Sequence, residues 1–270
     1  GHVNLTSAEA LDPALAPAAA EDLPPAAGGG ASRNALALYA FPQEARVAIE
    51  PVPFRTSSLR SLGAHLNVVA IEGAMDELAA MAGADPVAFR RAHLDDPRAA
   101  RVLEAAAAMS GWPEAPAGRA LGLGLARYKG RGAWCAAVAA VRVEEEARVE
   151  RLWLACDAGF LVNPEGARAQ VEGGAIQAAS WTLKEKVRLD AQGRVPAMGW
   201  DAYPILRFSE VPRVETRFLS DDGAPPLGCG EASQGPASAA IVNAVARALG
   251  LRVRRLPLTR EALVAAIAGG

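Results

Sequence analysis

The chain has few of the residues with which a protein binds a metal ion by itself. Its three cysteines, Cys135, Cys156 and Cys229, are far apart and form no CxxC pair, and its three histidines are equally dispersed. An odd number of cysteines without metal-ligand spacing argues against a disulfide framework and against a zinc site. We therefore expect free, mostly buried thiols, and we expect any metal to be held by an organic cofactor.

The sequence also lacks the features of membrane-spanning and nucleic-acid-binding proteins. No apolar run reaches the roughly 18–20 residues of a membrane-spanning helix, and the N-terminus has no basic segment followed by an apolar one. The formal net charge of -2 gives no reason to expect nucleic acid or an anionic membrane as a partner. The prediction is a cytoplasmic location, unless an upstream segment or a partner carries a targeting signal.

Composition divides the chain into a lead-in and one folded region. Residues 1–33 are rich in Ala, Pro and Gly without periodicity, which is typical of a flexible linker. Such an opening suggests that the chain begins within a larger polypeptide or pairs with a separate one. Residues 34–270 are expected to form the folded part, with a helical section at about 67–111 and a section of strands and helices at about 119–270.

Hydrophobic periodicity and capping residues predict a mixture of helices and strands. Two Asp-Pro pairs supply an N-cap followed by proline at the first helical position, and Thr259 is the expected N-cap of the last helix. The predicted helices are 67–82, one from Pro86, one from Pro97 to Gly111, 164–186, 237–249 and 259–267. The predicted strands are 119–128, 132–143, 147–157 and 213–219, and 35–53 is expected to be extended. Because helices and strands are interspersed, the predicted fold class is α+β, or mixed α/β.

The loop 228–236, GCGEASQGP, is the first candidate site. Glu231 is its only carboxylate and stands among glycines just before a predicted helix. Glycines let backbone amides approach a ligand closely, a helix N-terminus favours anionic groups, and a carboxylate against a cofactor pocket can act as a general base. Taken alone, such a loop is more often a Gly/Pro turn with a solvated glutamate.

The second candidate is one face of the helix 164–186. Gln170, Gly174 and Gln177 are spaced i, i+4, i+7 and share that face. Gly173 and Gly174 each cost the helix about 1 kcal/mol relative to alanine, so something should compensate for them. A polar ligand on this face and close helix packing at the glycine pair are both open explanations.

The third candidate is the segment 54–63, FRTSSLRSLG, which precedes the first long helix. Its arginines, its serines and Gly63 could bind an anion such as phosphate, although a loop with surface arginines is the more common case. The sequence has no GxxxxGK(S/T) loop, GxSxG elbow or HExxH helix. The pair Gly122 and Gly124 alone is too weak a signal to indicate a dinucleotide site.

Taken together and in this order, these segments resemble the molybdopterin-binding subunit of the xanthine dehydrogenase and aldehyde oxidase family. The similarity is greatest to large subunits of the nicotinate dehydrogenase and isoquinoline 1-oxidoreductase type. It extends from about Gly29 to Ile267 and concerns their C-terminal portion. The matching segments are FRTSSLRSLG (54–63), AIEGAMDELA (70–79), DPVAFR (85–90), DPRAARVLEAA (96–106), DAGFLVNPEGARAQVEGG (157–174), YPILRFSEVP (203–212) and PPLGCGEASQGP (225–236).

The resemblance implies a molybdenum hydroxylase, which oxidises a carbon of an N-heteroaromatic ring or an aldehyde with oxygen taken from water. It implies molybdenum held by a pterin, either molybdopterin or its cytosine dinucleotide form, so that no protein side chain binds the metal. It also implies that Glu231 is the general base. Arg60 is the counterpart of the arginine in the family's ArgGlyPheGly turn, here ArgSerLeuGly. The residues implied to line the cofactor are Arg60, Gly63, Gln170, Gly173, Gly174, Gly228, Cys229, Gly230 and Gln234.

Large subunits of this family are longer, and their N-terminal half supplies further cofactor contacts. The resemblance therefore implies three kinds of partner: that N-terminal half, a 2Fe–2S subunit, and a cytochrome c or flavin subunit. The sequence itself contains no iron–sulfur cysteine set and no flavin motif. The alternative is a structural or interaction module derived from such an enzyme, without catalysis. The intact GlyCysGlyGlu segment together with Gln170 favours the enzyme.

Overall fold

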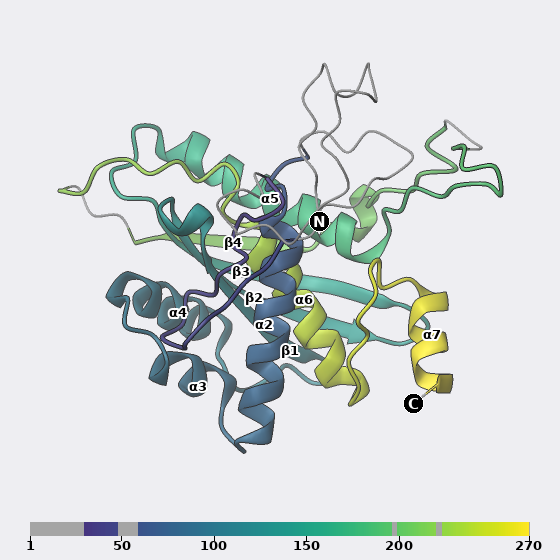
Figure 1. Cartoon of the computed structure of the whole chain (residues 1–270), viewed down its shortest axis with the longest axis horizontal. Helices are drawn as coiled ribbons and strands as arrows, with labels where there is room; N and C mark the ends of the chain where they lie inside the picture. The colour runs from purple at the N-terminus through teal and green to yellow at the C-terminus, as the bar shows by residue number, and fades with distance from the viewer. Residues whose placement is uncertain (1–29, 48–58, 196–198, 220–222, 270) are drawn as a thin grey trace.

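The computed structural model describes residues 30–47, 59–195, 199–219 and 223–269 (Figure 1). Most of the predicted lead-in, the end of the predicted extended segment, and the first half of the candidate anion loop lie outside these ranges. In the described part, 35–47 contains one isolated bridge residue, Val47, and otherwise irregular backbone.

A four-stranded sheet forms the centre of the described structure (Figure 1). Its strands are β1 (Ala120–Arg127), β2 (Trp134–Val143), β3 (Ala147–Asp157) and β4 (Arg213–Phe218), in that order. The first three strands are antiparallel, whereas β4 lies parallel to β3, because helix α5 (Pro164–Leu183) and a long connection return the chain to the same end of the sheet. The predicted strands are confirmed.

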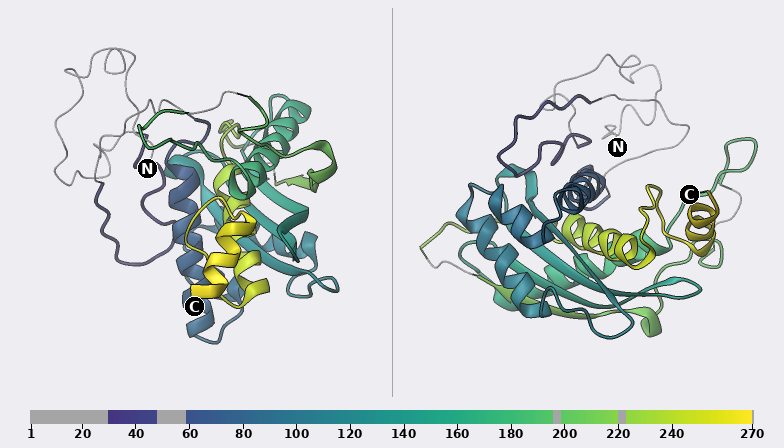
Figure 2. Two further views of the ribbon diagram at one scale, coloured as in Figure 1. Left: turned by 90° about the vertical axis from the view of Figure 1, so that its right-hand side faces the viewer. Right: turned by 90° about the horizontal axis from the view of Figure 1, so that it is seen from below.

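Apolar side chains on both faces of β2 explain why it reads as a continuous hydrophobic run. On one face, Ala137 and Ala139 belong to a core shared with α5 and α6 (Gln234–Leu249). On the other face, Ala136 and Val138 pack with α4 (Pro97–Ser110). Figure 2 shows α6 lying between the sheet and α2 (Ala64–Met81). The sheet is therefore the middle layer of a mixed α+β fold.

The predicted helix starts are confirmed by their capping bonds. Asp85 accepts hydrogen bonds from two amides of α3 (Pro86–Ala92), and Asp96 does the same for α4. Gly111 ends α4 with a left-handed φ of 76°. Thr259 Oγ1 accepts the Ala262 amide at 3.3 Å at the start of α7 (Arg260–Gly269). None of the helices placed here has the length and apolar character needed to cross a membrane.

Some helix boundaries differ from the prediction. Helix α2 begins at Ala64, three residues early, and α6 begins at Gln234 instead of residue 237. Asn67, at the predicted start of α2, instead directs its side-chain amide to the carbonyls of Ala31 and Arg33. The glycine and proline in the first turn of α6 obscured its start, because both residues are more typical of loops.

Helix α6 packs on β1 at very short range, and two glycines in the strand allow it. A Cβ on Gly122 would lie 2.1 Å from the amide nitrogen of Ala244 and 2.4 Å from the carbonyl oxygen of Ala240. A Cβ on Gly124 would lie 2.5 Å from the carbonyl oxygen of Pro236. These glycines therefore serve contact between strand and helix backbones.

Substitution of Gly122 by alanine is expected to destabilise the chain by roughly 1–3 kcal/mol or more, because the methyl group would press on helix backbone that has no room to yield. Gly173→Ala is the matched control, since nothing lies within 4 Å of a Cβ at that exposed helical position. The control should stabilise the chain by up to about 1 kcal/mol. Urea unfolding followed by circular dichroism measures both, and equal effects of the two substitutions would contradict this packing argument.

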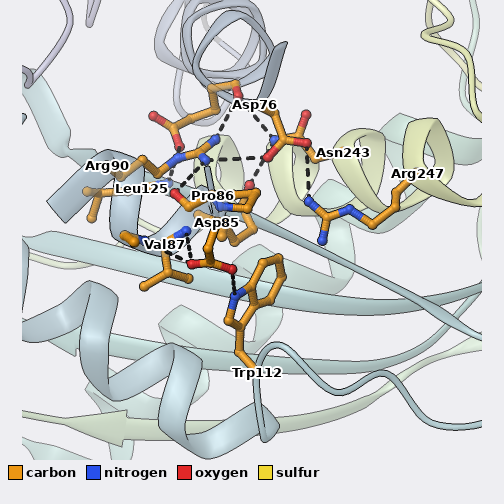
Figure 3. Close-up of polar contacts among 12 residues, drawn as sticks. Asp76, Asp85, Pro86, Val87, Arg90, Trp112, Leu125, Asn243 and Arg247 are labelled. Atoms are coloured by element: carbon orange, nitrogen blue, oxygen red, sulfur yellow. Dashed lines mark hydrogen bonds and ion pairs between the residues drawn. The ribbon is translucent and has the colours of Figure 1, made fainter. Parts of the chain in front are cut away.

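A group of buried charged side chains joins α2 to α3 (Figure 3). Arg90 and Glu72 are both 0% exposed, and Arg90 Nε lies 2.9 Å from Glu72 Oε2. Arg90 also donates to the carbonyl of Glu72 at 2.8 Å and to Asp76 Oδ1 at 3.4 Å. The Tyr39 hydroxyl donates to Glu72 Oε1 at 2.7 Å. The pair is thus hydrogen-bonded on several sides, as a buried charge requires.

The same group reaches β1 and α6. Glu72 Oε2 accepts the Leu125 amide at 3.1 Å, and Asn243 donates from its side chain to the carbonyl of Leu123 at 2.9 Å. Arg252 in turn donates to Asn243 Oδ1 at 2.8 Å. Side chains from two helices therefore bind backbone groups of the first strand.

Candidate active site

Glu231 lies in the loop that precedes α6, and two donors hold its carboxylate. Tyr128 Oη donates to Oε2 at 2.5 Å, and the Ser61 amide donates to Oε1 at 2.8 Å. Arg33 Nη1 lies 3.8 Å from Oε2 and donates to Tyr128 Oη at 2.8 Å. Residues from four separate segments of the chain therefore meet at this carboxylate.

These surroundings keep Glu231 ionised. Burial by itself raises the pKa of its carboxyl, but the hydrogen bonds from Tyr128 and Ser61 and the charges of Lys129 and Arg33 outweigh burial and lower the pKa below its ordinary value. Burial and the adjacent carboxylate raise the pKa of the Tyr128 hydroxyl, which therefore stays protonated and donates a hydrogen bond to Glu231. A charged carboxylate whose side chain is 32% exposed can accept a proton from a bound molecule.

The turn before α2 has an unusual backbone that directs the Ser61 amide to Glu231. Ser61 and Leu62 have left-handed φ values of 75° and 50°. Such conformations cost of order 1–3 kcal/mol for residues other than glycine and concentrate at functional sites. The next residue, Gly63, donates its amide to the carbonyl of Gly30 at 3.0 Å, and a Cβ there would lie 2.8 Å from that oxygen. In the described structure Gly63 thus contacts the end of the lead-in, and its role toward a cofactor stays a prediction.

Arg60 links the Glu231 loop to α5. Its Nε donates to the carbonyl of Gly230 at 2.6 Å, and its Nη2 donates to the backbone and side-chain oxygens of Gln170, each at 2.9 Å. Partial burial lowers the pKa of this guanidinium. The remainder of the candidate anion-binding segment, 54–58, lies outside the described residues. Arg60 therefore positions two parts of the site, and its binding of an external anion stays a prediction.

The predicted polar face of α5 divides into packed and open positions. A Cβ on Gly174 would lie 2.3 Å from Ser233 Oγ, so close helix packing accounts for this glycine. Gly173 is exposed with nothing within 4 Å of a Cβ, so packing does not account for it. Gln170 is also exposed, and Gln177 Oε1 is buried without a hydrogen-bond partner among the described residues. Close helix packing thus explains Gly174, whereas a polar ligand beside Gly173 stays a prediction.

The glycines of the Glu231 loop also have free space where a side chain would lie. Gly228 is exposed with nothing within 4 Å of a Cβ, and a Cβ on Gly230 would meet only Gln170 Oε1, at 3.4 Å. Between them, Cys229 is a buried free thiol, and burial raises its pKa to about 11. This thiol is therefore neutral at physiological pH and unreactive.

Gln234 is fully buried beneath the loop. With its amide oxygen toward Arg60, it accepts from Arg60 Nε at 2.6 Å and donates to the Glu231 carbonyl at 3.2 Å. Its amide is therefore engaged by the protein. Gln234 and Cys229 are both buried and therefore support the loop from the protein interior. A direct contact of either side chain with a cofactor stays a prediction.

The open positions suit a flat polar cofactor such as a pterin. Gln170 presents an amide nitrogen without a partner in the described part of the chain, and its side-chain oxygen lies 3.4 Å from the Cβ position of Gly230. The backbone is also bare at Gly173 and Gly228. Amides and bare backbone can bind ring nitrogens and carbonyls without adding charge. Within the described ranges, no group of three His, Cys, Asp or Glu side chains is placed to hold a metal ion. The donor set therefore fits an organic cofactor and does not resemble a metal-ligand cluster.

Two members of the site were absent from the sequence predictions. Arg33 was assigned to the flexible lead-in, and Tyr128 was assigned only to the end of a strand. The contact between Tyr128 and Glu231 joins residues 103 positions apart. No local pattern marks such a pair, because neither periodicity nor a capping signal depends on it.

Comparison with known proteins gives the family. Residues 52–212 match the molybdopterin cofactor-binding domain. The chain is 40% identical over 234 residues to a nicotinate dehydrogenase subunit from Pseudomonas putida, covering 80% of this chain and 20% of that protein. It is 38% identical over 206 residues to the beta subunit of isoquinoline 1-oxidoreductase from Brevundimonas diminuta, covering 74% of this chain and 26% of that protein. The chain therefore spans about a fifth to a quarter of the length of these relatives.

Solved structures agree with this match at the level of the fold. The aldehyde oxidoreductase of Desulfovibrio gigas aligns with a TM-score of 0.65 at 14% identity, over 79% of this chain and 42% of that chain. The aldehyde oxidoreductase of Desulfovibrio desulfuricans aligns with a TM-score of 0.66 at 15% identity, over 78% and 41%. The predicted fold class is confirmed. The chain belongs to the molybdopterin cofactor-binding domain family and corresponds to part of a molybdopterin-binding subunit of the xanthine dehydrogenase type.

Proposed function

We propose that this chain carries the general base of a molybdenum hydroxylase, and that the base is Glu231. The observation that carries the proposal is its ionised, partly buried carboxylate, held by Tyr128 and Ser61 beside the open positions of α5 and the glycine loop. The complete enzyme would oxidise a carbon of an N-heteroaromatic ring or an aldehyde with oxygen from water. The names of the relatives acting on nicotinate and isoquinoline support the heteroaromatic ring.

In this proposal the residues of the chain orient and move one proton. Each carboxylate oxygen of Glu231 accepts one hydrogen bond from the protein and keeps a second acceptor direction for the proton of the attacking water-derived oxygen. Tyr128 and Ser61 fix the carboxylate in advance, so little reorganisation is needed when the proton moves. The molybdenum–pterin cofactor, as molybdopterin or its cytosine dinucleotide form, would supply the redox centre that takes up the electrons.

Substitution of Gln170 by alanine is expected to weaken cofactor retention, because it removes an exposed amide from the open face of α5. Loss of one neutral hydrogen bond, about 0.5–1.5 kcal/mol, corresponds to roughly 2- to 12-fold weaker binding. Molybdenum per subunit after prolonged dialysis measures the effect. Gln192→Ala, at an exposed position in a separate loop, is the control. Molybdenum content equal to that of the wild type would remove Gln170 from the cofactor site.

We also propose that the chain works with the rest of its large subunit, with a 2Fe–2S subunit, and with a cytochrome c or flavin subunit, in the cytoplasm. The chain covers only 20% and 26% of the two relatives, and this supports a partner that supplies the rest of the large subunit. The test is purification from the native host, with molybdenum analysis, intact masses of every co-eluting chain, and assays with an N-heterocycle and an aldehyde. Molybdenum, companion chains and turnover support the enzyme. Their absence supports a non-catalytic module.

A further inference from the structure

The Tyr128 hydroxyl lies between a carboxylate and a guanidinium. It donates to Glu231 Oε2 at 2.5 Å and accepts a hydrogen bond from Arg33 Nη1 at 2.8 Å. Arg33 Nη1 also lies 3.8 Å from the same carboxylate oxygen. Hydrogen bonds in a chain polarise one another, so the bond from Arg33 strengthens the bond that Tyr128 donates. Arg33 thus acts on Glu231 in two ways, through its own charge and through Tyr128.

Backbone contacts on both sides hold this arrangement in place. The carbonyl of Arg33 accepts from the Asn67 side chain of α2 at 2.9 Å. The next residue, Asn34, donates to the carbonyl of Arg127 and accepts the Lys129 amide, each at 2.9 Å. The backbone on each side of the tyrosine is therefore tied to the backbone next to Arg33, and the two side chains meet by construction of the fold.

Two further cations act on the same carboxylate. Lys129 Nζ lies 5.0 Å from the centroid of the Tyr128 ring, and its charge contributes to the lowered pKa of Glu231. The charge of Glu231 also acts on Arg60, which binds the loop next to it. Both cations remain when Tyr128 or Arg33 is substituted, so they form a constant background for the comparison.

We propose that Arg33 and Tyr128 are positioning residues that act as a pair and fix the Glu231 carboxylate in the orientation in which it accepts a proton. The role of this carboxylate as the base rests on the proposed function, whereas its fixation by the pair does not. Without Tyr128 the carboxylate keeps one hydrogen bond, from the Ser61 amide to Oε1. A lost donor also destabilises the charged form, so the pKa of Glu231 rises.

The first measurement is the pKa of Glu231 in the full chain, by nuclear magnetic resonance of isotope-labelled glutamate, with Glu231→Gln identifying the signal. In Tyr128→Phe, which keeps the ring, the pKa should rise by about one unit. In Arg33→Met it should rise by about half a unit. Tyr203→Phe is the matched control, because Tyr203 Oη donates to a different glutamate, Glu185, at 2.9 Å. This control should leave the pKa of Glu231 unchanged.

The double variant tests whether the two residues act as a pair. Because part of the effect of Arg33 passes through the tyrosine hydroxyl, Arg33→Met should raise the pKa of Glu231 less in the Tyr128→Phe background than in the wild type. Equal rises in both backgrounds would show that Arg33 acts through its charge alone, and this would overturn the pairing.

Kinetics of the complete enzyme give a second readout. The acid limb of the kcat/KM profile should move to higher pH in Tyr128→Phe by the same shift, because a base must be ionised to accept a proton. Above that limb kcat should fall about 3- to 10-fold, while KM changes less than about 2-fold.

An unchanged pKa of Glu231 in Tyr128→Phe would overturn the proposal. A raised pKa without any change in the kinetic profile would contradict the proposed function alone, because Glu231 would be held by the pair without serving as the base.

Discussion

Glutamine at position 231 is expected to lower kcat of the complete enzyme by about 10²–10⁴-fold while its molybdenum content stays unchanged. Glutamine has the shape of glutamate, and its side-chain oxygen can still accept the Ser61 amide, which lies 2.8 Å from the carboxylate in the wild type. The amide cannot take up a proton at neutral pH. The substitution therefore removes the base and keeps the surrounding backbone in place.

Glu172→Gln is the matched control for this substitution. The side chain of Glu172 is 31% exposed, close to the 32% of Glu231, and it pairs with Arg168 on a different face of α5 from Gln170. Steady-state kinetics and molybdenum analysis are carried out on both variants. The control should have a kcat within about 3-fold of the wild type. A kcat of Glu231→Gln within that same range would show that Glu231 is not the base.

The largest expected loss of stability comes from Arg90→Met. Methionine leaves the carboxylate of Glu72 buried without its cation, and breaking a buried pair in this way typically costs about 3–5 kcal/mol. Tyr39 and the Leu125 amide still donate to Glu72, so the carboxylate keeps part of its hydrogen bonding. The free energy of unfolding of the full chain, from urea titration, measures the effect.

The next residue in the same helix gives the comparison. Arg91 pairs with Glu104 at 2.9 Å, but the two side chains are 53% and 57% exposed. An exposed ion pair contributes about 0–1 kcal/mol, so Arg91→Met should change the free energy of unfolding by less than about 1 kcal/mol. Similar effects of the two substitutions would show that burial is not what makes the Arg90 pair important.

The elements that sequence predicted well are those with local signals. Asp85 and Asp96 accept the amides that a helix start leaves unpaired, and β2 is apolar on both faces because both faces are covered. The boundaries that differ are set by tertiary contacts. Helix α2 starts early because its first turn packs against the end of the lead-in, where Gly63 donates to the carbonyl of Gly30.

The candidate site could be predicted in part, because most of its residues lie in segments with recognisable motifs. Arg60, Gln170 and Gly230 meet although they are 110 and 170 positions apart. The role of Tyr128 could not be predicted, since only the folded chain brings its hydroxyl to Glu231. Gly174 was left open between a ligand and close packing, and the packing role of Gly122 was not predicted, because a sequence does not show what would meet a Cβ.

The bonds from Glu72 and Asn243 to the first strand have a consequence for self-association. Among the described residues β1 lies at one edge of the sheet, and its eight residues are mostly apolar. Free backbone groups on such an edge offer a template for a strand from another molecule. Here the Leu125 amide and the Leu123 carbonyl bind side chains instead, which occupy positions that a pairing strand would need. The buried ionic group is thus also expected to disfavour edge-to-edge aggregation.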